Sequence, residues 1–136
     1  MQSVVRPKLS QVAQAAFPRA LKMSLPKTEH LPLVNQRCHY NAVQAVKTGL
    51  AVGVVEVVIT YSNSCSAHYV NLMADGSYVD FTLGQMCIND SYRFVRHVSP
   101  NEYETINESL MNLKKRLVAM LPWQFRLIVR DSDNWC

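Results

Sequence analysis

Hydrophobic and polar positions change their spacing along this 136-residue chain, and the changes mark out the predicted elements. Residues 52–61 are almost continuously apolar and rich in β-branched side chains, which predicts a central strand buried on both faces. Residues 67–73 and 77–83 alternate more clearly and flank Ala74-Asp75-Gly76, which is typical of a β-hairpin. Residues 91–97 form a candidate fourth strand.

Apolar side chains at helical spacing predict a helix on either side of these strands. The first covers residues 38–48, and Gly49 is expected to end it. The second begins at Ser99-Pro100-Asn101-Glu102, a capping box with proline at the first helical position, and Pro122 ends it. The buried stripe of this second helix is expected to consist of Ile106, Leu110, Leu113, Leu117 and Met120.

The two ends of the chain carry weaker patterns. Residues 10–22 suggest a helix interrupted by Pro18, and the proline-containing residues 23–35 are typical of an extended connection. Residues 124–130 form a candidate last strand. The order of helix, three or four sequential antiparallel strands and helix predicts an α+β domain with its helices gathered at one face of the sheet.

Composition and charge divide the chain into two parts. A hydrophobic content of 49% is enough to build one packed core, which we expect in residues 36–136. Five of the fourteen basic residues but one of the ten acidic residues lie in residues 1–35, so this basic N-terminal arm carries the whole net charge of +4. The arm is either a solvated amphipathic segment, packed through Val12, Ala15, Ala16 and Phe17, or a contact for an acidic partner. Nucleic acid is unlikely as that partner, because few aromatic residues interleave the charges.

The four cysteines are Cys38, Cys65, Cys87 and Cys136. None belongs to a CxxC pair, so a zinc knuckle is not expected, and we expect no metal and no cofactor. Their wide spacing indicates reduced thiols in a cytoplasmic protein. The N-terminus lacks the apolar core of a secretory signal, and the longest apolar stretch is too short to span a bilayer, so no membrane association is expected.

Cys38, His68 and Asp80 are the strongest candidates for chemistry. A thiol needs a nearby base to act as a nucleophile, and the base needs a third group to orient it. A two-residue hairpin turn would place Asp80 on the sheet face opposite His68. A three-residue loop with Gly76 in the left-handed conformation would instead place Asp80 opposite Val70, on the same face as His68 and diagonal to it. The competing interpretation is that Cys38 and His68 are ordinary core residues.

Other polar residues have weaker claims. Asn41 lies one helical turn from Cys38 and is a candidate neighbour of the site. Asn35 and Gln36 are candidate donors to an oxyanion, or else they cap the helix. His39 points about 100° away from Cys38 around the helix, which makes it a poor base. Glu56, inside an apolar strand, is expected to be an edge-facing or paired structural residue and not a catalytic one.

The segments RCHYNAV and AHYVNLMADGSYVDFT resemble the core of papain-like or transglutaminase-like cysteine hydrolases, in particular small phage and bacterial proteins with this Cys-His-Asp order. The resemblance covers about residues 35–84. It implies a papain-like core in which Cys38 is the nucleophile, His68 the base and Asp80 the residue that orients the base. A papain-type glutamine is missing upstream of Cys38, so Asn35 or Gln36 would have to supply the oxyanion donor.

Two functions follow from these patterns. The first is a thiol hydrolase or acyl transferase that acts on an amide bond of a protein or peptide through an acyl-enzyme on Cys38. The second is a non-catalytic relative with the same fold, which binds or inhibits a host protein in the manner of a phage effector, with the basic arm as its contact surface. In either case we expect a cytoplasmic protein, located in the host cytoplasm if a phage encodes it.

Overall fold

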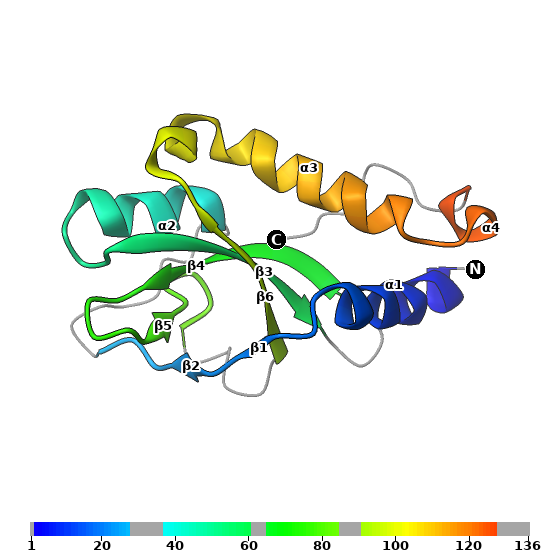
Figure 1. Cartoon of the computed structure of the whole chain (residues 1–136), viewed down its shortest axis with the longest axis horizontal. Helices are drawn as coiled ribbons and strands as arrows, with labels where there is room; N and C mark the ends of the chain where they lie inside the picture. Colours follow the sequence, from blue (N-terminus) through cyan, green and yellow to red (C-terminus); the bar gives the residue numbers. More distant parts are fainter. Residues whose placement is uncertain (1, 28–36, 61–64, 85–90, 128–136) are drawn as a thin grey trace.

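The computed structural model describes residues 2–27, 37–60, 65–84 and 91–127 (Figure 1). These residues form a mixed α+β fold of four α-helices, one 3₁₀ helix and six strands. The helices are α1 (Gln2–Ala16), α2 (Cys38–Lys47), η2 (Pro100–Thr105, the 3₁₀ helix), α3 (Ile106–Ala119) and α4 (Trp123–Arg126). The strands are β1 (Ala20–Leu21), β2 (Met23–Ser24), β3 (Gly53–Thr60), β4 (Cys65–Leu72), β5 (Tyr78–Val79) and β6 (Ser91–Val98).

The six strands form one sheet in the order β1-β6-β3-β4-β5-β2. Strand β3 lies near its middle, antiparallel to both β4 and β6, and is buried along nearly its whole length, as its continuous apolar run predicted. The β4–β5 hairpin is present as predicted, but β5 covers only Tyr78–Val79 of the expected residues 77–83, because residues 81–83 form a turn. Strand β6 matches the candidate fourth strand.

The sheet closes on itself through the segment that contains β1 and β2. Ala20 and Leu21 pair with β6, whereas Met23 and Ser24 pair in parallel with β5, and only Lys22 separates the two pairings. One extended segment therefore joins both ends of the sheet and makes it barrel-like. Residues 23–35 were expected to be an extended connection, and the pairing of Ala20–Ser24 could not be predicted because two-residue strands carry no periodicity.

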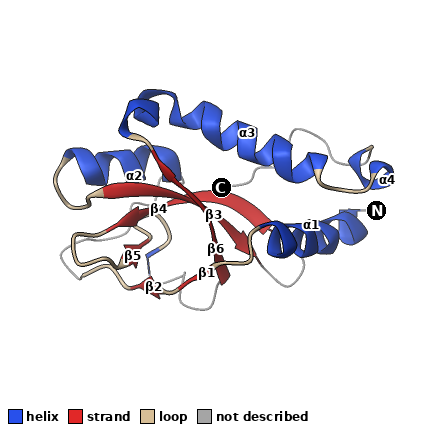
Figure 2. Cartoon of the chain, in the orientation of Figure 1, coloured by secondary structure: helices blue, strands red, loops and turns tan. Residues whose placement is uncertain are grey.

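The two faces of the closed sheet have different neighbours. Figure 2 shows α2 and α3 on one side of β3 and β4, with β1 and β2 on the other. Val54, Val58 and Tyr69 face outward and pack in the core under α1, α2 and α3. Val55, Val57 and Val70 face inward, where Leu21, Met23 and Tyr92 complete a second cluster. Side chains on β4 thus reach either the helices or the barrel interior, according to their parity.

The N-terminal residues belong to the same core. Helix α1 begins earlier than predicted, runs through Pro7 and ends before Pro18. It buries Val5, Leu9 and Ala13. Phe17 is buried and Val12 packs against the core as expected, whereas Ala15 and Ala16 are exposed, contrary to the expectation.

The C-terminal half agrees with the sequence pattern except at its end. Helix α3 buries Ile106, Leu110, Leu113 and Leu117, whereas Met120, expected in the same stripe, is the C-cap of the helix and is exposed. The predicted strand over residues 124–130 is wrong for its described part, because α4 forms after Pro122 and Trp123–Arg126 are helical. Residues 128–130 lie outside the described residues. Among the described residues, no helix has the length and apolar character needed to cross a membrane.

Candidate functional site

The β4–β5 hairpin sets the position of Asp80. The Met73 N–H donates to the Ser77 carbonyl at 2.8 Å, and Gly76 takes a φ of +85°, so the loop has three residues with glycine in the left-handed conformation. Asn71 pairs with Val79, which places Asp80 opposite Val70. The second of the two turn geometries considered from the sequence is therefore confirmed.

His68 and Asp80 form a buried dyad inside the barrel. His68 Nε2 lies 2.7 Å from Asp80 Oδ2, and the two residues are 2% and 0% exposed. An ionised carboxylate can only accept hydrogen bonds, so Nε2 carries the proton that His68 shares with Asp80. The unprotonated nitrogen of a neutral His68 is then Nδ1, which is the atom able to take a proton from a nucleophile.

Three further donors hold the Asp80 carboxylate. Oδ1 accepts the N–H groups of Thr82 at 2.9 Å and Leu83 at 3.0 Å, and Oδ2 also accepts the Tyr92 hydroxyl at 2.7 Å. Burial is the largest single influence on the pKa of Asp80 and raises it. The hydrogen bond and charge of His68, with the Leu83 and Tyr92 hydrogen bonds, outweigh burial and keep that pKa below its usual value. Asp80 is therefore ionised at neutral pH.

Tyr92 and Thr82 were not identified as site residues from the sequence. Tyr92 is 1% exposed on β6 and reaches Asp80 across the barrel interior. The sequence does place Tyr92 in a candidate strand, but the partner of that strand and its facing side cannot be derived from spacing alone. The signal that points to Thr82 is weaker still, because a threonine after an aspartate is common in turns.

Cys38 occupies the first position of α2, as predicted. Arg37 stands at the N-cap, and its side chain cannot accept a hydrogen bond, so it does not cap the first amides of the helix. The first amides of a helix and the helix dipole favour negative charge at this end. Cys38 is fully buried and packs with the outer-face core beside Ala42 and Ala67.

The redox state of Cys38 differs from the expectation. Cys38 is disulfide-bonded, and its partner lies outside the described residues, so the expectation of reduced thiols is wrong for this cysteine. Cys65 is a free, buried thiol, and burial raises its pKa to about 12. Cys87 and Cys136 lie outside the described residues.

Cys38 and His68 approach β4 from different sides. Cys38 packs on the helix-covered face, whereas His68 alternates with Ala67 and Tyr69 and points into the barrel. Within the described residues, β5 pairs with β4 only at Asn71 and Leu72.

The turn after β5 connects these two faces. The Asn41 side-chain amide donates to Thr82 Oγ1 at 3.1 Å, and the Thr82 N–H donates in turn to Asp80. Asn41 lies in the first turn of α2, three residues after Cys38. Asn41, which was selected from the sequence as a neighbour of the site, is thus linked to Asp80 through Thr82.

The other candidates lie apart from the dyad. His39 is half-buried, and burial with the nearby charges of Arg37 and Lys114 lowers its pKa. His97 is exposed and packs edge-on against Phe94. Asn35, Gln36 and His30 lie outside the described residues.

Glu56 is a paired structural residue, as expected. It is 3% exposed and accepts the Tyr69 hydroxyl at 2.8 Å, and Arg96 lies 3.4 Å from its other oxygen. Arg96 also binds Glu102 at 2.9 Å. This network ties the outer face of the sheet to η2, away from the dyad.

Comparison with known proteins gives no further assignment. Among the described residues, no group of three or more histidine, cysteine or acidic side chains is arranged to hold a metal ion. No protein-family model, curated protein or solved structure matches this chain.

Proposed function

We propose that this protein is a thiol hydrolase or acyl transferase of papain-like architecture, latent while Cys38 is held in a disulfide. The observation that carries the proposal is the turn from Asp80 to Leu83. Within this turn, Asp80 is hydrogen-bonded to His68, and Thr82 is hydrogen-bonded to Asn41 in the first turn of α2. One short segment therefore links the helix that carries Cys38 to the proposed base.

The proposed reaction begins after a dithiol reductant has converted the disulfide into two thiols. His68 Nδ1 takes the proton of the Cys38 thiol, and the thiolate attacks the amide carbonyl carbon of a protein or peptide substrate. The C–N bond breaks, His68 returns the proton to the leaving amine, and the acyl group remains on Cys38 as a thioester. Water or a second amine then attacks the thioester and releases the cysteine.

Asp80 supports this role for His68 in two ways. Its carboxylate accepts a hydrogen bond from Nε2–H. This bond favours the tautomer of His68 in which Nδ1 is unprotonated and can act as the base. It also stabilises the imidazolium that forms when the proton moves, because its carboxylate remains charged. The N-terminal amides of α2 stabilise the Cys38 thiolate.

The second candidate is a non-catalytic binding or inhibitory module. The observation that favours it is the state of Cys38, which is fully buried, disulfide-bonded and on the face of β4 opposite to the side chain of His68. Under this alternative the dyad is a buried polar cluster that specifies the fold. The contact surface is then the basic N-terminal segment.

Reactivity of Cys38 separates the two functions. The protein is treated with a dithiol reductant, transferred to pH 6 and exposed to iodoacetamide, and labelled peptides are mapped by mass spectrometry. An activated thiol reacts at this pH, whereas an inert buried thiol does not. A parallel sample receives p-nitrophenyl acetate, and intact mass detects an acetyl group on Cys38. We expect both reactions to require the reductant.

Two variants complete the test. His68→Gln should slow acylation by about 100-fold or more, because a positioned base contributes on that scale. Cys65→Ala is the matched control, since it removes the other buried thiol without touching the dyad. Reduced protein that stays folded and whose Cys38 reacts no faster than Cys65 would refute the thiol hydrolase and leave the binding module as the remaining candidate.

A further inference from the structure

We propose that Tyr92 is a positioning residue of the dyad, which sets the strength with which Asp80 holds His68. This inference deepens the proposed function and rests on it. Its basis is that Tyr92 and His68 bind the same oxygen atom. Tyr92 Oη and His68 Nε2 both lie 2.7 Å from Asp80 Oδ2.

The remaining oxygen of the carboxylate is already engaged. Oδ1 accepts two main-chain N–H groups, from Thr82 and Leu83, which fix the carboxylate plane. The charge that the carboxylate presents at Oδ2 is therefore divided between the tyrosine hydroxyl and the imidazole. Each donor weakens the hydrogen bond of the other donor to Oδ2. An oxygen that already accepts one short charge-assisted hydrogen bond has less negative charge available for a second one.

Tyr92 is held rigidly enough for this role. It is 1% exposed and pairs with Ile59 on β3 and with Leu21 on β1, so two neighbouring strands fix its backbone. Its ring lies edge-on to the His68 imidazole, with ring centroids 6.4 Å apart. A buried tyrosine hydroxyl needs a hydrogen-bond partner, and Asp80 supplies it.

A purely structural role makes a different prediction from a positioning role. If Tyr92 only satisfied a buried carboxylate, its removal would change stability and leave the imidazole of His68 as it was. If Tyr92 shares Oδ2 with His68, removal of the hydroxyl strengthens the bond from Nε2–H to Asp80. The chemical shift of the Nε2 proton reports that bond directly.

The experiment is an NMR comparison of the His68 ring in ¹⁵N-labelled protein, with the resonance assigned from its loss in His68→Gln. Tyr92→Phe should move the Nε2 proton downfield. Tyr78→Phe is the matched control, because Tyr78 packs against the same inward-facing cluster; it should leave the resonance in place. Folded Tyr92→Phe protein with an unshifted Nε2 proton overturns the inference.

A second variant covers the case in which Tyr92→Phe does not fold. Site-specific replacement of Tyr92 by 3-fluorotyrosine keeps the hydroxyl and makes it a stronger donor, so the Nε2 proton should move upfield. No movement, or a downfield one, contradicts the inference. The acylation of reduced wild-type protein is measured separately. Its absence refutes the proposed hydrolase, while the NMR comparison still decides whether Tyr92 controls the hold of Asp80 on His68.

Discussion

The Asn71 side chain donates hydrogen bonds to two main-chain carbonyls, that of Ala42 in α2 at 2.8 Å and that of Gly53 at the start of β3 at 3.1 Å. One buried amide thereby joins the helix that begins with Cys38 to the sheet beneath it. Asn71 is 1% exposed; its bond to the Ala42 carbonyl is buried, and its bond to the Gly53 carbonyl is partly buried. Asn71 therefore helps to hold α2 against the sheet that carries the dyad.

Replacement of Asn71 by leucine should therefore destabilise the protein. One buried and one partly buried hydrogen bond are lost, which corresponds to about 1–3 kcal/mol in the free energy of unfolding. Urea unfolding followed by circular dichroism measures the change. Asn112→Leu is the control, because Asn112 is exposed on α3 and its replacement should change stability by less than about 0.5 kcal/mol. Equal stability of the two variants would show that Asn71 does not anchor α2.

The Cys38 disulfide should contribute measurably to stability. Addition of a reductant should lower the free energy of unfolding of the wild-type protein by about 2–4 kcal/mol, which is typical of a cross-link that restricts the unfolded chain. Cys38→Ala should be insensitive to the reductant, and Cys65→Ala should respond as the wild type does. A wild-type urea midpoint that ignores the reductant would show that the bond is absent in solution.

Cys65 should be protected from alkylation in the folded protein. Its pKa is raised to about 12 by burial, so almost no thiolate is present at pH 8. Iodoacetamide at pH 8 should label Cys65 only after urea has unfolded the chain, as peptide mapping can show. Rapid labelling of the folded protein at this position would contradict the buried environment described for β4.

The pattern of apolar residues was sufficient to predict β3 from its continuous apolar run, the β4–β5 hairpin from alternation around a turn, and α2 from its helical spacing. The facing of Asp80 was left open between a two-residue turn and a three-residue loop, and the structure selected the three-residue loop. The pairing of β1 and β2 and the contact of Tyr92 with Asp80 could not be predicted. Both depend on strand neighbours far apart in the sequence, and periodicity carries no information about them. The disulfide of Cys38 could not be predicted either, because the spacing of the cysteines along the chain does not select which of them are bonded.

Asp80 should make the free energy of unfolding of the protein depend on pH in the acidic range. Its pKa is lower in the folded state than its ordinary value of 3.8, since the contacts with His68, Leu83 and Tyr92 outweigh the opposing effect of burial. The ionised group therefore stabilises the fold above pH 3.8, and this contribution is lost as the pH falls through the lower folded pKa.

Comparison of Asp80→Asn with the wild type tests this dependence. The free energy of unfolding is measured in urea from pH 7 to pH 2. The destabilisation caused by the variant should be largest at neutral pH and should shrink below pH 3.8. A deficit that grows as the pH falls would mean that the folded-state pKa of Asp80 is raised instead.

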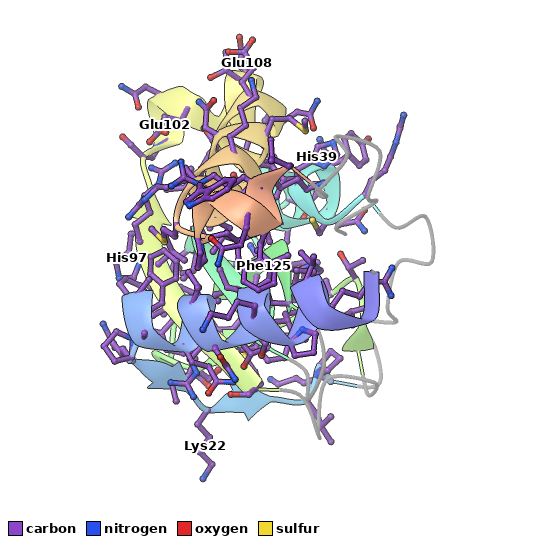
Figure 3. All side chains as sticks on the ribbon, turned by 90° about the vertical axis from the view of Figure 1, so that its right-hand side faces the viewer. Lys22, His39, His97, Glu102, Glu108 and Phe125 are labelled. Atoms are coloured by element: carbon purple, nitrogen blue, oxygen red, sulfur yellow. The ribbon has the colours of Figure 1, made fainter. Side chains whose placement is uncertain are left out.

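Basic residues near the N-terminus should attract an acidic partner if they form a contact surface. Figure 3 shows Lys22 projecting from one end of the molecule, with Glu102 and Glu108 at the other end. Lys8→Glu, Arg19→Glu and Lys22→Glu together should weaken binding to polyglutamate, and added salt should weaken wild-type binding in the same way. Because Arg19 also lies 4.5 Å above the Phe94 ring, a Lys8→Glu, Lys22→Glu double variant separates charge from packing.

The control for this surface is Lys115→Glu on α3, an exposed position on a different element. It changes the net charge by the same amount per substitution. Binding that falls equally with Lys115→Glu would reflect overall charge and not a localised surface. Binding that ignores salt and all of the substitutions would leave the N-terminal residues with a packing role alone.

The single extended segment that pairs with both β5 and β6 has a consequence for association between molecules. An open sheet offers two rows of unpaired main-chain groups, and a strand from another chain can add to either of them. Here Ala20–Ser24 pairs with part of both edges of the sheet at once. These few residues therefore reduce the tendency of the sheet to add strands from other molecules. Because one segment covers both edges, its displacement would expose two unpaired sheet edges at the same time. It would also open the barrel interior, which contains His68, to solvent.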